Sequence, residues 1–187
     1  MPMIREAIVT TINRMGHPHL APIGLIEDGE GWIIAPFLPS ATRDNLVETS
    51  LAVANYTDDA RIFAGLVTGR RDWPLVPASK SPVPRLAEAL AHAELSVTHV
   101  EDDVARPRFH CRIVHKEQHA PFAGFNRAAN AVLECAILLT RLHILPRDKI
   151  EREIAYLAIA IEKTAGPREQ EAWSWLMQKH AAFYARK

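Results

Sequence analysis

The sequence has no surplus of charge of either sign. Its 187 residues include 22 Lys and Arg against 22 Asp and Glu, so the formal net charge is zero. A chain without a net field does not attract nucleic acid or an anionic membrane surface through charge. We therefore expect neither nucleic acid nor a membrane among its partners, and we expect recognition to depend on shape and local chemistry.

Cysteines and long apolar runs are also scarce. Cys111 and Cys135 are the only cysteines, and no segment reaches the roughly 18 uninterrupted apolar residues of a membrane span. The first residues, Met-Pro-Met-Ile-Arg-Glu, lack the apolar run of a signal peptide. These features predict a cytoplasmic protein with both thiols reduced.

Several motifs of catalysis and nucleotide binding are missing. The sequence contains no Gly-x-Ser-x-Gly nucleophile elbow and no Gly-x-Gly-x-x-Gly dinucleotide fingerprint. The pair Gly65 and Gly69 is followed by Arg70 and not by the Lys-Ser or Lys-Thr of a Walker loop. A nucleoside triphosphate or a Rossmann-bound cofactor is therefore not expected.

Nine histidines raise the question of a metal site. The densest run lies in residues 110–119, but along an extended strand His115 and His119 would stand about 13 Å apart. His17 and His19 would be roughly 7 Å apart, which is also too far to share one zinc ion. Because Cys-x-x-Cys and His-Glu-x-x-His patterns are absent as well, we predict no metal site.

The N-terminal part contains short, β-branched apolar segments bounded by Gly, Pro, Asn or Asp, a pattern typical of strands. The predicted strands are residues 7–12, 20–26, 31–38 and 51–57. Asp28-Gly29 supplies residues that tolerate positive φ, which predicts a hairpin between the second and third strands.

The middle of the chain is less regular. Residues 60–69 predict a short helix that Asp58 or Asp59 caps and Gly69 ends. Four prolines in residues 73–84 exclude a helix or a central strand, and they favour an ordered surface connection. Residues 86–103 begin with helical spacing and end with alternation, and residues 106–119 alternate throughout, so sheet structure resumes there.

From Asn126 onward the periodicity is helical. Two amphipathic segments are separated by Pro146, and Gly166-Pro167 ends the second and begins a third. These helices are too apolar to stand alone in water, so they must pack on the barrel or on a second subunit.

Polar side chains gather where the third strand gives way to a helix. Ser40, Thr42 and Asn45 stand in a Ser-x-Thr-x-x-Asn arrangement, and Arg43 adds a positive charge. Hydroxyl and amide donors at a helix start suit a phosphate, which indicates a cofactor held against a barrel. The alternative is a simple helix cap worth about 1 kcal/mol.

Several motifs in this order resemble the FMN-binding split-barrel family, and within it an uncharacterised subfamily associated with tetrahydromethanopterin-linked metabolism. The N-terminal motifs are Glu6-Ala7-Ile8-Val9-Thr10-Thr11, Ala21-Pro22-Ile23-Gly24, Ser40-x-Thr42-x-x-Asn45-Leu46 and Val53-Ala54-Asn55-Tyr56-Thr57-Asp58-Asp59. The C-terminal motifs are Phe125-Asn126-Arg127-Ala128, Glu134, Thr140-Arg141-Leu142 and Lys163-Thr164-Ala165-Gly166. In such families Asn often stands at the position of His19.

This resemblance implies an α+β fold, an antiparallel split β-barrel with a C-terminal helical layer. We place the FMN-binding barrel domain at residues 1–122 and the helical region at residues 123–187. The resemblance further implies a homodimer with the flavin at the subunit interface.

The resemblance also suggests a set of cofactor-binding residues. Ser40, Thr42, Arg43 and Asn45 would hold the phosphate. A flat wall for the isoalloxazine ring would come from the following residues: Thr10, Thr11, His19, Ala21, Pro22, Ile23 and Gly24. The alternative is that the two threonines are ordinary strand residues and that the proline protects an edge strand from aggregation.

Two further residues are candidates for cofactor contacts. Asn55 would lie near the flavin, although an Asn ahead of Asp-Asp is also common turn chemistry. Arg127 opens a helix, where the macrodipole disfavours a cation unless an anion lies nearby, so it is a candidate for phosphate or substrate contact. Simple solvent exposure is the alternative for Arg127.

The function implied is an FMN-dependent oxidoreductase that transfers hydride through flavin N5. NAD(P)H or a small molecule, with a pterin suggested by the family, would be its reaction partner. The alternatives are a non-enzymatic flavin-binding accessory protein and a structural dimer without flavin. No carboxylate pair, Cys–His pair or metal cluster has convincing catalytic spacing, so we expect the redox chemistry to belong to the flavin and assign no catalytic residue.

Overall fold

A computed structural model describes residues 2–185, which form two compact units. The barrel unit contains residues 2–57 and 73–122, and the helical unit contains residues 58–72 and 123–185. The sequence analysis assigned residues 58–72 to the barrel domain, whereas their helix packs with the C-terminal helices.

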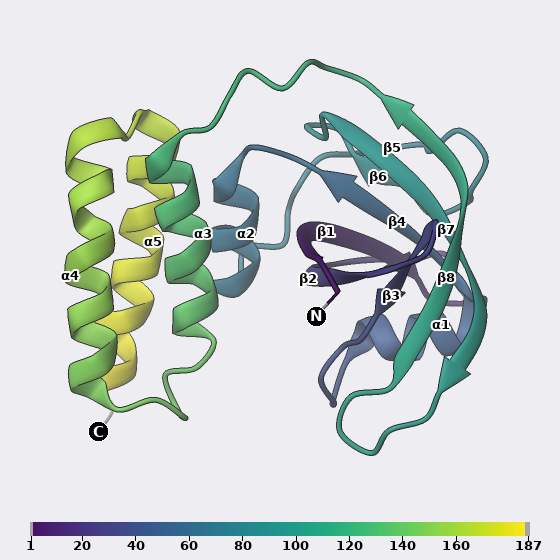
Figure 1. Cartoon of the computed structure of the whole chain (residues 1–187), viewed down its shortest axis with the longest axis horizontal. Coiled ribbons are helices and arrows are strands. Elements are labelled where there is room, and N and C mark those ends of the chain that lie inside the picture. Colours follow the sequence, from purple (N-terminus) through teal and green to yellow (C-terminus); the bar gives the residue numbers. More distant parts are fainter. Residues whose placement is uncertain (1, 186–187) are drawn as a thin grey trace. The chain divides into compact units, whose positions relative to one another are not determined.

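The barrel unit is a closed antiparallel barrel of six strands (Figure 1). Its strands follow the order β1-β2-β3-β8-β7-β4 around the barrel. Their bounds are β1 Ile4–Ile12, β2 Pro18–Asp28, β3 Gly31–Ile34, β4 Leu51–Tyr56, β7 Ala91–Glu101 and β8 Arg108–Gln118. The predicted α+β barrel is confirmed.

The hairpin between β2 and β3 forms where Asp28-Gly29 predicted it. Asp28 pairs with Gly31, and Gly29 has a φ of 57°, a conformation that costs glycine little. On the neighbouring strand β8, the carbonyl oxygen of Cys111 would collide with a Cβ on Gly31. Glycine is therefore required where β3 approaches β8.

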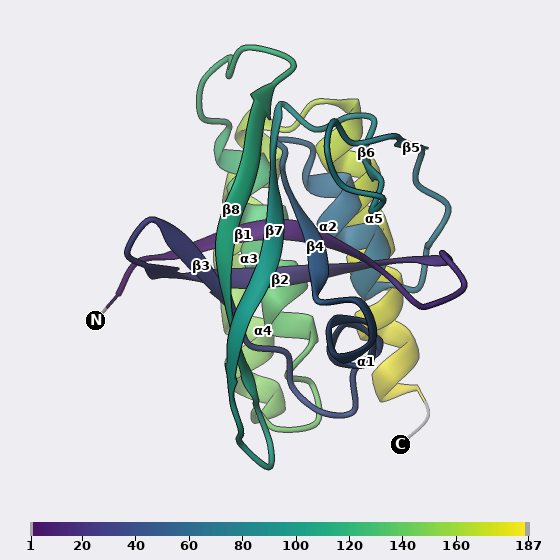
Figure 2. The same ribbon diagram turned by 90° about the vertical axis from the view of Figure 1, so that its right-hand side faces the viewer.

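Alternating apolar side chains fill the interior of the barrel. Helix α1, Ala41–Thr49, packs against β1, β2 and β4 and contributes Leu46 to this core (Figure 2). The buried core residues are Ala7, Val9, Leu25, Ile34, Leu46, Ala52, Ala54, Ala93, Leu95, Phe109 and Cys111.

The proline-rich connection is ordered and contains a short ladder of β5, Leu75–Val76, and β6, Arg85–Leu86. The helical spacing that begins at Leu86 was misleading, because the structure has β6 and then β7 there. Leu86 and Ala89 are buried against the barrel, and the Leu86 amide donates to the Asn55 side chain. Tertiary contacts therefore override the local helix propensity.

The helical unit contains four helices: α2 Ala60–Val67, α3 Arg127–Leu139, α4 Arg147–Thr164 and α5 Pro167–Tyr184. The Asp59 side chain caps α2 by accepting from the Arg61 amide, and three C-terminal helices follow as predicted. Their shared core includes Ala64, Val132, Cys135, Leu139, Ile150 and Leu176. Among the described residues, no helix has the length and apolarity to cross a membrane.

Candidate functional site

Helix α1 begins with the predicted polar cluster. The Ser40 hydroxyl accepts from the Arg43 amide at 3.3 Å, which makes Ser40 the N-cap. Thr42 and Asn45 are both buried and lie three residues apart on one side of the helix. The Ser40 cap uses the Arg43 amide, one of the amides of the first helical turn. The helix dipole has its positive end here, which favours a bound anion.

Asn45 connects this helix to the barrel wall. Its amide group donates to the Thr11 hydroxyl at 3.0 Å in a buried hydrogen bond. Thr11 is paired with His19 across the β1–β2 ladder. The structure therefore brings Asn45, Thr11 and His19 into one neighbourhood, on the side of the barrel that α1 covers.

Strand β2 has an open edge beside this neighbourhood. Residues 18–26 pair with β1 on one side, but β3 pairs only with residues 26–28 on the other side. Pro22 lies in the stretch without a second partner strand, as the sequence predicted for a residue that lacks an amide hydrogen. Ala21, Pro22, Ile23 and Gly24 are all partly exposed. Their backbone groups can address the edge of a planar ring.

Gly24 does not itself leave room for a ligand. A Cβ placed there would lie 2.8 Å from Cγ2 of Ile4 and 3.2 Å from Oε1 of Glu6. The space beside Gly24 is thus filled by two β1 side chains. Because Gly24 has no side chain, these two β1 side chains can pack closely against β2.

Asn55 and Thr10 form a second buried polar cluster on β4 and β1. The Asn55 amide group donates to the Ile8 carbonyl at 2.8 Å and to the Thr10 hydroxyl at 3.0 Å. Its oxygen accepts from the Leu86 amide at 2.7 Å. Both polar atoms of this fully buried side chain are therefore engaged in joining β1, β4 and β6.

The two candidate arginines lie in different units. Arg43 of the barrel unit is partly exposed, and its guanidinium lies 3.1 Å from the Asp44 carboxylate. Arg127 of the helical unit is the first residue of α3 and lines a shallow pocket of about 250 Å³ with Glu134 and Tyr156. Arg127 thus belongs to a different unit from the other candidates.

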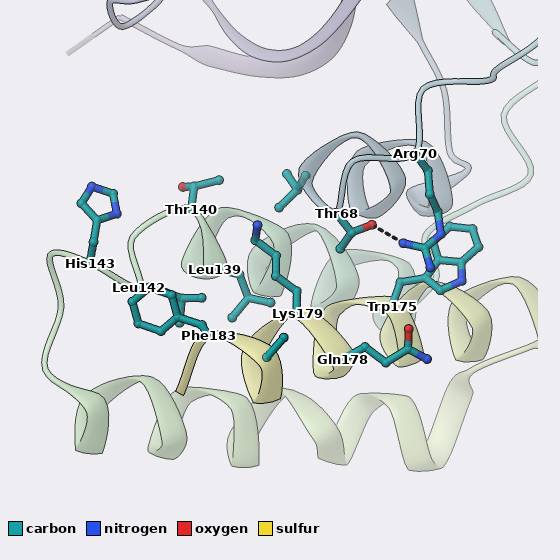
Figure 3. A pocket seen from close by; sticks show the side chains of 12 residues that line it. Thr68, Arg70, Leu139, Thr140, Leu142, His143, Trp175, Gln178, Lys179 and Phe183 are labelled. Atoms are coloured by element: carbon teal, nitrogen blue, oxygen red, sulfur yellow. Dashed lines mark hydrogen bonds between the residues drawn. The ribbon is translucent and has the colours of Figure 1, made fainter. Parts of the chain in front are cut away.

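The helical unit carries a larger groove of about 550 Å³, which Figure 3 shows from close by. Arg70 lies over the Trp175 ring at 4.4 Å and donates to the Thr68 hydroxyl at 2.8 Å. Lys179 and His143 also line the groove, and no acidic residue does. Such a surface favours an anionic group next to an aromatic face.

Sequence reasoning missed a cluster of histidines and glutamates on β7 and β8. His92 pairs with Glu117 across the ladder, and Glu94 pairs with His115, so four such side chains share a face. His119 joins them just after β8. The alternating pattern of both strands was visible in the sequence, but the register that pairs them was not.

Ionisation in this cluster is shifted by its surroundings. Burial and the nearby Arg85 guanidinium lower the pKa of His119. The pKa of Glu94 is also lowered: burial opposes the charged form, but hydrogen bonds from the Lys80 and Ser79 amides and from His92 outweigh it. A neutral imidazole and an ionised carboxylate are thus favoured near neutral pH.

The barrel fold described above is shared with solved structures that include a flavin reductase with a split-barrel domain. The chain belongs to the DUF447 family: the N-terminal domain of this protein family of unknown function matches residues 5–120, and its C-terminal domain matches residues 126–178. Comparison with curated proteins finds no match.

Solved structures share the fold. An FMN-bound protein of the same family from Methanosarcina mazei superimposes with a TM-score of 0.81 at 21% identity, covering 96% of each chain. A 2-nitrobenzoate 2-nitroreductase from Pseudomonas fluorescens gives 0.54 at 23% identity, covering 64% of this chain and 66% of its own. An NADH:FAD oxidoreductase from Streptomyces globisporus gives 0.51 at 12% identity, covering 61% and 75%.

Proposed function

We propose that this protein binds FMN and acts as a flavin-dependent oxidoreductase on a small substrate. The observation that carries the proposal is the start of α1, where Ser40 and the buried Thr42 stand on a helix docked through Asn45 and Thr11 to the barrel. The likeness to an FMN-bound member of the family over 96% of each chain supports the same cofactor.

The residues present fit the phosphate of FMN. A phosphate dianion is stabilised by backbone amides at a helix start and by neighbouring hydroxyl donors. The first turn of α1 offers both, and Arg43 lies at the same end of the helix. Ser40 and Thr42 would then donate to phosphate oxygens, while Arg43 would exchange its contact with Asp44 for the anion.

The ring would lie along the open edge of β2. Ala21 and Pro22 offer a flat, partly exposed surface there, and residues 21–25 pair with β1 but not with β3. Backbone groups on the side of β2 away from β1 can address the polar edge of an isoalloxazine ring. His19 lies on this strand and pairs with Thr11 across the β1–β2 ladder.

When bound, FMN would supply the redox chemistry by accepting and donating hydride at N5. The chain's own residues would bind and orient the ring and exclude water from one face. NAD(P)H is the proposed electron donor, supported by the fold shared with an NADH-dependent oxidoreductase. A pterin is the substrate class that the family resemblance suggests.

We also propose that the protein is a homodimer. Helix α4 buries only Ile150 completely, while Tyr156 and Ile159 are 76% and 46% exposed. Apolar surface of this kind favours a partner, and a second copy of the chain would cover it. The family resemblance also suggests a flavin at the interface between the two copies.

Turnover by the reconstituted protein separates an enzyme from a flavin carrier. The protein is saturated with FMN, and NADH or NADPH is mixed with it under anaerobic conditions while the flavin absorbance is recorded. Bleaching of bound flavin and its return with an electron acceptor support the oxidoreductase. Bound flavin that dithionite reduces but neither nicotinamide nor a reduced pterin does would favour the accessory role.

A further inference from the structure

The histidines and glutamates on β7 and β8 form a group whose chemistry does not depend on flavin binding. His92, Glu117 and His119 each present one ligand atom, and these atoms all lie within 4.8 Å of one another. His92 is 1% exposed, whereas Glu117 and His119 reach the surface. The group thus has a fixed inner ligand and two outer ligands accessible to solvent.

The buried Glu94 determines which nitrogen of His92 faces the others. Its carboxylate lies 3.3 Å from Nε2 of His92, and it accepts from the Ser79 and Lys80 amides at 2.8 and 2.9 Å. With Nε2 donating to Glu94, the unprotonated Nδ1 points at Nε2 of His119, 2.8 Å away. A carboxylate behind a histidine is the arrangement that orients metal-ligating imidazoles in proteins.

Glu117 is oriented in a similar way. The Ser79 hydroxyl hydrogen-bonds to its carboxylate, and Nε2 of His115 lies 3.5 Å from the same group. One short segment of the proline-rich connection therefore supports both Glu94 and Glu117. The supporting shell is built from residues on three separate stretches of the barrel unit.

We propose that His92, His119 and Glu117 form a binding site for a borderline divalent metal ion such as Zn²⁺. Two imidazoles and a carboxylate are ligands that this class of ion accepts, and three protein ligands leave a fourth position for water. Tetrahedral ligands around zinc lie roughly 3.3 Å apart. The two imidazole nitrogens, which are 2.8 Å apart, must therefore separate slightly to bind one ion.

A second group, His99, Glu101 and His110, is also close enough to hold a metal ion. Here the ring nitrogens of His110 already face carboxylates, with Asp28 at 2.7 Å and Glu101 at 3.1 Å. Direct contacts between His110 and these two carboxylates account for this arrangement without a metal. It provides the matched control for the site proposed above.

The test is a calorimetric titration of the full-length protein with Zn²⁺. The protein is first dialysed against a chelator to remove bound metal. We expect one ion to bind per chain, with at least tenfold weaker binding in His119→Ala and in Glu117→Gln. Glu94→Gln should weaken it about 10–100-fold, as expected for an orienting residue. His99→Ala and the exposed His17→Ala should bind as the unmodified protein does.

A second measurement distinguishes a loss of metal binding from unfolding of the variant. Circular dichroism reports the fold of each variant, and a saturating amount of Zn²⁺ should raise the melting temperature of the unmodified protein but not that of Glu117→Gln. The proposal is overturned if no ion binds more tightly than about 100 μM. It is equally overturned if His99→Ala removes binding, or if His119→Ala and Glu117→Gln keep it.

Discussion

At the scale of single residues, two buried amides perform different tasks. Asn45 joins α1 to β1 through one hydrogen bond to Thr11, whereas Asn55 makes four hydrogen bonds that join β1, β4 and β6. The sequence offered both as cofactor contacts, because an Asn near a strand end has the same appearance in either role. The hydrogen bonds seen in the structure distinguish the roles of the two side chains.

Replacing Asn55 with Ala should destabilise the barrel by about 2–4 kcal/mol. The substitution leaves the Leu86 amide without its acceptor in a buried position, and such a group costs about 1–3 kcal/mol in addition to the lost bonds. Urea unfolding measures the change. The exposed Asn130→Ala should change stability by less than about 0.5 kcal/mol, and equal effects of the two variants would refute the structural role.

Both cysteines should be unreactive in the folded protein. Cys111 and Cys135 are buried, and burial raises the pKa of each thiol to about 12. At pH 8 only about one molecule in ten thousand then carries a thiolate, against roughly a quarter for a free cysteine. Native protein mixed with a disulfide reagent should label slowly, and both thiols should react at once in denaturant. Rapid native labelling would contradict this burial.

At the scale of elements, most helices and strands could be predicted, including the short α2, whereas β5, β6 and the structure of residues 86–90 could not. The strands β1, β2, β4 and β8 and the helices α3, α4 and α5 each carry several turns or pleats of consistent periodicity. Residues 86–90 have helical spacing over barely more than one turn, which tertiary contacts easily override. The pairing of β7 with β8, and with it the cluster around His92, depends on register and not on local pattern.

The N-terminus of α3 should depend on Asn126. Its side-chain oxygen accepts from the Ala128 and Ala129 amides at 2.8 and 3.1 Å, and its amide group donates to the Thr164 carbonyl of α4 at 3.2 Å. Asn126→Ala should cost about 1 kcal/mol, and Asn126→Asp should retain most of the cap. Thermal unfolding followed by circular dichroism compares them. Identical melting temperatures for Ala and Asp would show that the cap contributes nothing.

At the scale of the whole molecule, the sequence predicted a barrel and a helical region, and the structure groups residues 58–72 with the C-terminal helices. Helix α2 shares its core with α3 and α5 although the barrel strand β4 directly precedes it. The apolar face of α2 was visible in the sequence, but its packing partner was not.

The proposed dimer can be tested through the exposed face of α4. Light scattering coupled to gel filtration should give about twice the 20.9 kDa chain mass at micromolar concentration. A charged residue in place of Tyr156, with Ile159→Lys as a second variant, should shift the protein to a monomer, since a specific interface must bury about 1,000 Å² or more. A monomer in the unmodified protein would rule out the dimer.

The central claim is that the start of α1 holds the phosphate of FMN, and a fluorescence titration of flavin quenching tests it most directly. Thr42→Val replaces a hydroxyl with a methyl group of similar size, and Thr49→Val makes the same change at the other end of the helix. FMN and riboflavin, which lacks the phosphate, are titrated against both variants and the unmodified protein.

A hydrogen bond to a charged group is worth about 1.5–3 kcal/mol. We therefore predict that Thr42→Val weakens FMN binding at least tenfold, that Thr49→Val does not, and that riboflavin binds all three proteins equally weakly. Equal FMN affinity in the two variants, or no FMN binding by the unmodified protein at micromolar concentration, would contradict the claim.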